Sequence, residues 1–201
     1  MSPEITPVAL IIFLGTIGIS LYTMYKDESL FERMLLSPWQ VVHENKWYTL
    51  ITSGFIHADM GHLLFNMITF FFFAFQLESV VGSIDFLIIY FVSLVLSDVS
   101  SVIKHKDNPS YRSVGASGAI AGVLFSFILY APTSTIMIFP IPFPIPSPIF
   151  GLLYLAYSFF AARKQADMIN HEAHFWGAVS GMAVTVILEP RVLAHFFNSV
   201  F

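Results

Sequence analysis

Apolar residues fall into six runs along this chain, separated by segments that hold most of its charges. The runs cover about 7–25, 61–77, 86–103, 117–131, 148–162 and 173–188. Each lies near the roughly 17–25 residues that a helix needs to cross the apolar part of a bilayer. Backbone polar groups in hydrocarbon must be satisfied within the structure, which a closed bundle of helices achieves. The pattern therefore predicts an all-α membrane protein, a bundle of six transmembrane helices.

Two of the connecting segments have patterns of their own. Residues 26–60 mix charged side chains with apolar ones such as Leu30 and Phe31, which is typical of an amphipathic loop lying partly in the membrane interface. Residues 139–148 read FPIPFPIPSP. Each proline lacks a backbone N–H and has a fixed φ, so we expect this segment to form neither a helix nor an interior strand. It is predicted to connect the fourth and fifth spans.

Composition strengthens the membrane interpretation. Hydrophobic residues make up 56% of the 201 residues and charged residues only 11%, far below the roughly 25% of a soluble domain. With no cysteine, the chain has no disulfide framework, thiolate metal site or cysteine nucleophile. A net charge of −4 without a basic cluster argues against nucleic acid as a partner. We expect one membrane domain over 1–201, whose first run is a retained span because no basic stretch precedes it.

The fourth run opens with Gly115-Ala116-Ser117-Gly118. Flanking glycines allow a tight turn and a close approach of the backbone to another group. They place Ser117 near a helix N-terminus, where unpaired N–H donors favour developing negative charge. This setting suits a nucleophilic serine. The structural alternative is a packing face formed by Gly118 and Gly122, which is common in membrane helices.

The sixth run opens with Ala173-His174, followed by Gly177 and Gly181. An imidazole that faces lipid is costly, so His174 is expected to point into the bundle. The three small residues recur every four positions and form a flat face on which another helix can rest. Packing of the two small-residue faces would bring His174 within hydrogen-bond reach of Ser117, which activation of a serine requires.

His62 and Asn66 lie one helical turn apart in the second run, so both present hydrogen-bond donors from one face. Both side chains would be expensive if they faced lipid. Paired donors aimed at one point are what an oxyanion needs. The alternative is structural hydrogen bonding between helices, worth about 0.6 kcal/mol in membranes.

These three motifs, in this order and on these helices, resemble the rhomboid family of intramembrane serine proteases. The family has G-x-S-G on its fourth helix, A-H-x-x-G on its sixth and H-x-x-x-N on its second, and the resemblance covers most of the chain. It implies a six-helix rhomboid-like bundle with Ser117 as nucleophile and His174 as general base and acid, without a catalytic carboxylate. His62 and Asn66 would then stabilise the oxyanion.

The resemblance also implies partners and an access route. Family substrates are membrane-anchored proteins, cut near the membrane surface where their helices unwind readily. No cofactor or metal is implied. The fifth helix and the loop before the sixth are commonly described as the gate through which a substrate enters.

The chain departs from the family pattern at two places. Tyr48-Thr49 stands where many members have Trp-Arg in the first loop. Ala121 stands where many members have an aromatic residue that stacks on the catalytic histidine. We therefore expect another side chain, such as Phe175 or Trp176, to pack against His174.

Two other functions remain open. An inactive rhomboid-like protein would bind membrane proteins without cutting them, although retention of all four site residues argues against it. A metalloprotease or transporter is a third class, but His171-Glu172-Ala173-His174 is H-E-x-H and lacks the i, i+4 histidines of a zinc motif. We predict no metal and interpret His171 as a lone interfacial histidine. Asp98 suits either a proton pathway or an interhelical hydrogen bond.

The orientation in the membrane is a point on which residues and resemblance disagree. Eight of the nine Lys and Arg residues follow the first, third or fifth run, and Arg191 alone lies on the other side. The positive-inside rule places those eight in the cytoplasm. The resemblance implies the reverse, with both termini cytoplasmic and Ser117 opening outward from the cell membrane. We follow the resemblance, since the first loop can be held by interfacial insertion.

Overall fold

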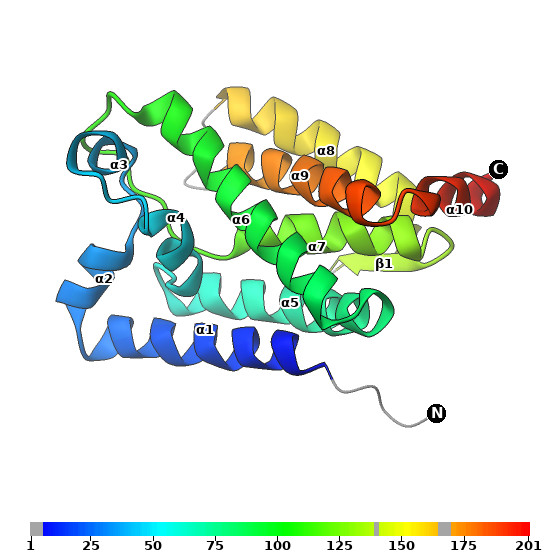
Figure 1. Ribbon diagram of the computed structural model, residues 1–201, viewed down its shortest axis with the longest axis horizontal. Coiled ribbons are helices and arrows are strands. Elements are labelled where there is room, and N and C mark those ends of the chain that lie inside the picture. Colours follow the sequence, from blue (N-terminus) through cyan, green and yellow to red (C-terminus); the bar gives the residue numbers. More distant parts are fainter. Residues whose placement is uncertain (1–5, 139–140, 165–169) are drawn as a thin grey trace.

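Helices occupy all six predicted runs in the computed structural model, which describes residues 6–138, 141–164 and 170–201. Figure 1 shows how they pack into one bundle. Three of them, α1, α5 and α6, are long and apolar enough to cross a membrane, and α9 with the helix after it is a fourth candidate. The mostly helical membrane fold is therefore confirmed, whereas the count of six spans stays a prediction. The helices are α1 (Pro7–Tyr25), α5 (Met60–Val81), α6 (Ser83–His105), α7 (Ser117–Tyr130), α8 (Ser147–Lys164) and α9 (His171–Leu188).

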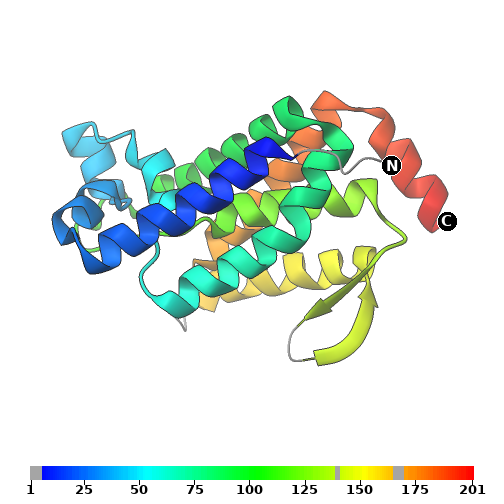
Figure 2. The same ribbon diagram turned by 90° about the horizontal axis from the view of Figure 1, so that it is seen from below.

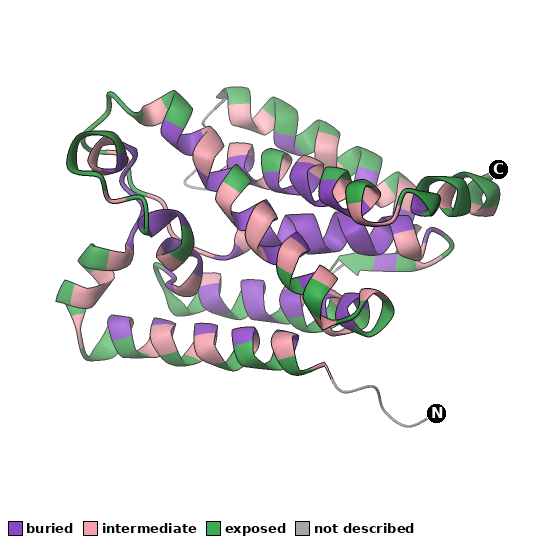
Figure 3. Ribbon diagram, viewed as in Figure 1, coloured by how far each residue is buried: buried purple, intermediate pink, exposed green. Residues whose placement is uncertain are grey.

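Helix α7 is the most enclosed element of the bundle. Every residue from 118 to 129 is buried, and the helix lies between α5, α6 and α9 (Figure 3). A helix that is apolar on all sides is stable only in such a position. Ser117 thus stands at the end of the central helix.

The predicted packing of the two small-residue faces is present. A Cβ atom added to Gly177 would overlap the carbonyl oxygen of Gly118 and lie 2.9 Å from its Cα. One turn further along, a Cβ at Gly181 would overlap Gly122 in the same way. Helices α7 and α9 therefore touch backbone to backbone, which only glycine allows at these positions.

The first connecting segment is largely helical and forms one end of the molecule (Figure 1). Leu36 and Ser113 exchange both backbone hydrogen bonds, each 3.0 Å long, which ties the segment to the strand-like stretch before α7. The Thr52 hydroxyl donates to the Met34 carbonyl at 2.9 Å. The segment contains α2 (Glu28–Met34), α3 (Pro38–Glu44), α4 (Thr49–Thr52) and the 3-10 helix η1 (Ser53–Phe55).

The proline-rich connector lies in the predicted region but has more order than expected, and it ends earlier than predicted because Ser147 and Pro148 already belong to α8. It forms an antiparallel hairpin of β1 (Thr135–Ile138) and β2 (Ile141–Pro146), with Thr135 opposite Pro146. Figure 2 shows the hairpin projecting from the bundle. Proline is tolerated because both strands of a two-stranded sheet are edge strands, where a missing N–H costs no ladder bond. Residues 139 and 140 of the predicted connector lie outside the described residues.

Helix α1 receives its N-terminal cap from another helix. The buried carboxylate of Glu78, on α5, accepts hydrogen bonds from the backbone N–H groups of Val8 at 3.1 Å and Ala9 at 2.6 Å. The Ser83 hydroxyl donates to the same carboxylate at 2.6 Å. A negative charge at a helix N-terminus is favourable. At the opposite end of the chain, α10 (Arg191–Val200) is bent by 112° relative to α9.

Candidate active site

Ser117 is the first residue of α7 and is half-buried. Gly115, two residues earlier, has a φ of 111°, in the left-handed region that favours glycine. Its N–H donates to the Ser53 carbonyl at 2.9 Å. The first N–H groups of a helix have no partner within the helix. The serine thus stands beside backbone donors, at the end of a segment that is held in place from the first loop.

The backbone at Gly115 passes directly against the ring of His62. A Cβ atom at Gly115 would lie 2.6 Å from Cε1 and 2.8 Å from Nε2 of that ring. Glycine is therefore required both by its φ and by the space that the imidazole takes. This contact brings His62, on α5, to the segment that leads into Ser117.

A second histidine, His57, supports the first. Its ring centroid lies 4.9 Å from that of His62 at an interplanar angle of 76°, and its Nδ1 is 2.9 Å from the Ser20 hydroxyl on α1. His57 is fully buried. Burial lowers its pKa to about 3, with a smaller contribution from His62. His57 therefore stays neutral at physiological pH and packs against His62 without adding a charge.

Asn66 lies on the buried face of α5 with 4% of its surface exposed. Its amide nitrogen donates to the backbone carbonyl of His62, one turn earlier, at 2.9 Å. The amide carries two hydrogens, so this bond leaves one for another acceptor. The Asn66 side chain is thus hydrogen-bonded to the backbone of His62, the other residue of the predicted donor pair.

His174 lies in the first turn of α9 and, like Ser117, is half-buried. Its backbone N–H donates to the Asn170 carbonyl at 3.2 Å. A Cβ at Gly118, the neighbour of Ser117, would lie 3.5 Å from the carbonyl oxygen of Ala173, the neighbour of His174. The backbone contacts therefore bring the start of α7 against the start of α9.

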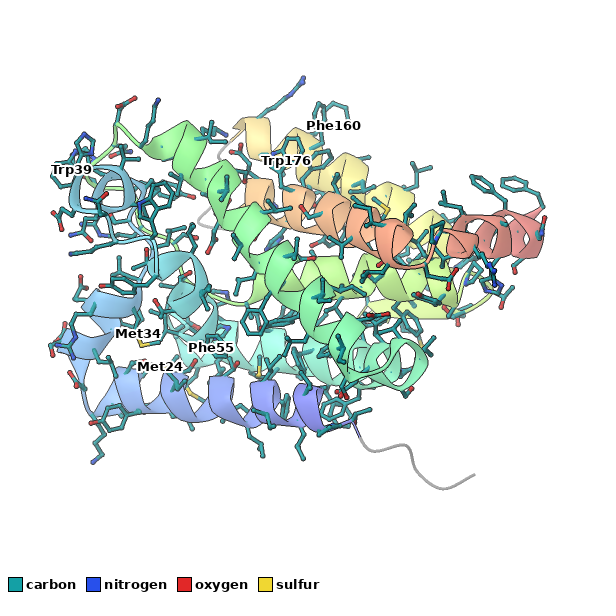
Figure 4. All side chains as sticks on the ribbon, viewed as in Figure 1. Met24, Met34, Trp39, Phe55, Phe160 and Trp176 are labelled. Atoms are coloured by element: carbon teal, nitrogen blue, oxygen red, sulfur yellow. The ribbon has the colours of Figure 1, made fainter. Side chains whose placement is uncertain are left out.

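One aromatic neighbour of His174 comes from a helix that the sequence did not indicate. The Tyr154 ring, on α8, lies 6.4 Å from the His174 ring at an interplanar angle of 24°. Phe175 packs with Phe159 and Trp176, and Trp176 is 44% exposed near the edge of the bundle (Figure 4). Tyr154 is thus one side chain that packs against His174, and a contact of His174 with Phe175 or Trp176 stays a prediction.

Two polar groups tie the site to the surrounding helices, and sequence reasoning gave neither of them this role. Asp98 accepts a hydrogen bond from the Ser53 hydroxyl at 2.9 Å, so its partner is η1 and not another long helix. Ser53 also accepts the Gly115 N–H. Asn170 caps α9 and donates to hydroxyl groups on two other elements. The sequence signal for Asn170 was its residue type directly before an apolar run, which favours an N-cap.

His171 is not the lone interfacial histidine that we expected. It is 5% exposed, and its ring lies 5.3 Å from the Tyr157 ring and 6.0 Å from the His174 ring. The first turn of α9 places it against α8, where the Tyr157 ring packs edge-on to it. Within residues 6–138, 141–164 and 170–201, no three His, Cys, Asp or Glu residues are grouped as a metal site requires.

Comparison with known proteins agrees with this helical membrane architecture. The model of the rhomboid domain matches residues 44–191, and the chain therefore belongs to the rhomboid family. RHOMBOID-like protein 2 of Arabidopsis thaliana is 35% identical over 174 residues, which are 82% of this chain and 50% of that protein. Putative rhomboid protease YdcA of Bacillus subtilis is 38% identical over 89 residues, 44% of this chain and 43% of that protein.

A mitochondrial relative, RHOMBOID-like protein 12 of Arabidopsis thaliana, is 26% identical over 160 residues, 72% of this chain and 46% of that protein. The chain thus spans about half the length of the curated relatives it matches. Rhomboid proteins are generally intramembrane serine proteases, although some members are inactive. The curated relatives include mitochondrial proteins.

Proposed function

We propose that this protein is an intramembrane serine endopeptidase in which Ser117 is the nucleophile and His174 is its general base and acid. The observation that carries the proposal is the glycine contact between α7 and α9. Because Gly118 rests on Ala173 and Gly177, the residues that flank Ser117 and His174 lie together. Both side chains are half-buried, which leaves them accessible to a substrate and to water.

In the proposed reaction, the His174 imidazole accepts the Ser117 hydroxyl proton as the serine oxygen attacks a peptide carbonyl carbon. The resulting imidazolium then gives this proton to the leaving amine, and the C–N bond breaks. Water, deprotonated by the same imidazole, hydrolyses the acyl-enzyme and regenerates the serine. No carboxylate is assigned a role, so the pair acts as a dyad.

The negative charge on the substrate oxygen is assigned to donors at the start of α7 and on α5. His62 lies against Gly115, and Asn66 is hydrogen-bonded to the carbonyl of His62. Backbone N–H groups at the N-terminus of α7 add further donors and a favourable helix dipole. Donors that are fixed before the reaction stabilise the oxyanion without reorganising.

The substrates are proposed to be membrane-anchored proteins cut near the membrane surface. Helix α7 has 14 residues, which at about 1.5 Å per residue span about 21 Å. The hydrocarbon core is about 30 Å thick. If Tyr130 lies at one interface, Ser117 lies below the other, within reach of a transmembrane segment that unwinds there. Helix α8, which packs mainly on α9 and carries several exposed side chains, is the proposed side of entry.

We further propose that both termini are cytoplasmic and that the Ser117 end faces outward from the cell membrane. The Lys and Arg distribution favours the opposite orientation. A C-terminal reporter that is active only in the cytoplasm, combined with an impermeant label directed to residues 105–112, distinguishes them. A silent reporter and a protected label would reverse the proposed orientation.

One assay tests the proposed activity. Purified protein in liposomes is given a generic transmembrane-segment substrate, with Ser117→Ala and His174→Ala as matched variants and a serine-directed electrophile as probe. We expect wild type to cleave and to be labelled at Ser117, neither variant to cleave, and chelators to have no effect. Equal, background cleavage by wild type and Ser117→Ala would instead favour a rhomboid-like protein that binds membrane proteins without cutting them.

A further inference from the structure

Asn170, directly before α9, uses its side chain to contact three separate parts of the chain. Its Oδ1 accepts the Ala173 N–H at 3.0 Å and so caps α9. Its Nδ2 donates to the Ser101 hydroxyl on α6 at 2.9 Å. The same nitrogen donates to the Ser113 hydroxyl, in the segment before α7, at 3.3 Å. The amide therefore uses its acceptor and both of its donor hydrogens.

Asparagine at position 170 has more hydrogen-bonding groups than capping of α9 alone requires. Serine, threonine and aspartate cap a helix as well as asparagine does, because each supplies an oxygen acceptor. Among the preferred capping residues, only asparagine adds two N–H donors on the same group. The hydrogen bonds to Ser101 and Ser113 use those donors.

The segment before α7, which Asn170 contacts through Ser113, is itself held by backbone hydrogen bonds. Ser113 exchanges two backbone hydrogen bonds with Leu36, both 3.0 Å long. Two residues further on, the Gly115 N–H is bonded to the Ser53 carbonyl, and Ser117 follows. Asn170 thus connects to a stretch whose position relative to the first loop is set by three backbone bonds.

The other end of the connection is the histidine helix. The His174 N–H donates to the carbonyl of Asn170 itself, so His174 belongs to the turn that Asn170 starts. Another polar link of this turn, between Glu172 and Lys104, is 2.6 Å long but has side chains 21% and 38% exposed. Exposed ion pairs contribute little to holding a fixed geometry. The part-buried amide of Asn170 is better suited to that task.

We propose that Asn170 is a positioning residue that holds the start of the His174 helix against the segment leading into Ser117. The proposal rests on the assignment of Ser117 and His174 as a dyad. Two of the bonds of Asn170 cross from the start of α9 to α6 and to the segment before α7. They restrict sliding and rotation of that start, on which hydroxyl-to-imidazole geometry depends.

The test separates two roles of Asn170: the bonds from its Nδ2 to Ser101 and Ser113, here called the clamp, and the cap that its Oδ1 provides to α9. Asn170→Ser keeps an acceptor for the cap and removes both donors, and its kcat, KM and thermal midpoint are measured in liposomes with a transmembrane-segment substrate. We expect kcat to fall about 10-fold or more, since misplacement by about 1 Å costs up to about 100-fold. KM should change less than about twofold, because ground-state binding is not removed.

Two variants complete the design. Combining Asn170→Ser with Ser113→Ala should lower kcat little further than Asn170→Ser alone, since Asn170→Ser already breaks the bond to Ser113. Ser126→Ala removes the buried hydrogen bonds that Ser126 makes with Gly181 and Thr185 of α9, at the far end of the contact between α7 and α9, and should lower the thermal midpoint with wild-type kcat. A wild-type kcat in Asn170→Ser, or a loss that follows the thermal midpoint as in Ser126→Ala, would overturn the proposal.

A measurement that does not depend on catalysis distinguishes the proposal for Asn170 from the proposal of a Ser117–His174 dyad. Hydrogen exchange by mass spectrometry over residues 171–177 should be faster in Asn170→Ser than in wild type and unchanged in Ser126→Ala. Unchanged exchange in Asn170→Ser would overturn the clamp whatever the activity of the protein. Absence of any Ser117-dependent cleavage in wild type, combined with faster exchange, would instead overturn the dyad and leave the clamp supported.

Discussion

The two ends of the contact between α7 and α9 are built alike and differ in what they enclose. Glycine pairs, Gly118 with Gly177 and Gly122 with Gly181, bring the backbones together at each end. Each end also has a hydroxyl on α7. Ser117 at one end is half-buried, whereas Ser126 at the other is fully buried.

We call the Ser117 end of the contact the open end and the Ser126 end the closed end. At the closed end, the hydroxyl groups of Ser126 and Thr185 are hydrogen-bonded within the bundle. Ser126 donates toward the carbonyls of Gly122 at 2.8 Å and Gly181 at 3.2 Å, and Thr185 lies 2.7 Å from Ser126. Such a satisfied group is costly to disturb and unavailable to a ligand. At the open end, Ser117 stands at the helix N-terminus, between Gly115, which lies against the His62 ring, and Gly118, which lies against the Ala173 carbonyl. The two ends thus share their helix packing and differ in the exposure and surroundings of the hydroxyl, which is the difference that the proposed role of Ser117 requires.

The largest expected effect comes from removing the serine hydroxyl oxygen on α7 at one end or the other. Ser117→Ala should reduce cleavage to background with an unchanged thermal midpoint, because it removes chemistry and little packing. Ser126→Ala should keep its turnover number but lower stability by about 1–3 kcal/mol, because carbonyl and hydroxyl groups in the core lose a partner. Liposome cleavage assays and thermal unfolding in detergent measure both. The comparison would fail if Ser126→Ala were inactive while still folded.

The second effect concerns the oxyanion donors proposed above. Asn66→Ala should lower kcat by about 10²–10³-fold, the usual cost of one such donor, and less than Ser117→Ala does. Thr69→Val is the matched control, because Thr69 makes a hydrogen bond of the same local kind to the Phe65 carbonyl, at 2.9 Å. It should leave kcat unchanged. An Asn66→Ala protein with a strongly lowered thermal midpoint would indicate a structural role instead.

The third effect tests the glycine contacts common to both ends. Gly177→Ala and Gly181→Ala should each destabilise the protein by about 1–3 kcal/mol, because the added methyl overlaps backbone atoms of α7. Gly177→Ala should in addition lower kcat of the protein that remains folded, since it separates Ser117 from His174. Gly15→Ala on α1, where a Cβ meets nothing within 4 Å, is the control and should be neutral or stabilising by up to about 1 kcal/mol. Equal kcat values in the first two variants would contradict the comparison.

The smallest effect is a dependence of stability on pH from His57. The folded protein keeps this ring neutral down to its pKa of about 3, whereas an unperturbed histidine takes up a proton near pH 6.5. The contribution of His57 to stability is therefore fully present above about pH 6.5 and is lost progressively as the pH falls toward 3. We expect the thermal midpoint of His57→Gln to fall less than that of wild type between pH 7 and pH 5. Parallel pH profiles would contradict this assignment.

The sequence predicted much of this protein because the relevant signals are local. Apolar runs long enough for a bilayer located six helices. Prolines excluded a helix from 141–146, whereas Ser147 and Pro148 already belong to α8, since proline is tolerated in the first turn of a helix. Small residues spaced by four predicted the faces on which α7 and α9 meet, since that spacing returns to one side of a helix. The motifs around Ser117, His174 and His62 placed candidate groups at helix starts. All of these depend on residues within a few turns of one another.

Only the tertiary structure decided which distant groups meet at the site. Tyr154 lies beside His174, Ser53 joins Asp98 to Gly115, and Asn170 contacts both α6 and the segment before α7. His171 is buried for the same reason, because α8 covers it. Nothing in the spacing of these residues along the chain relates them, since their contacts depend on how the helices are rotated and tilted against each other. That arrangement is set by packing of the whole bundle, where glycines allow the closest approach and bulky side chains prevent it.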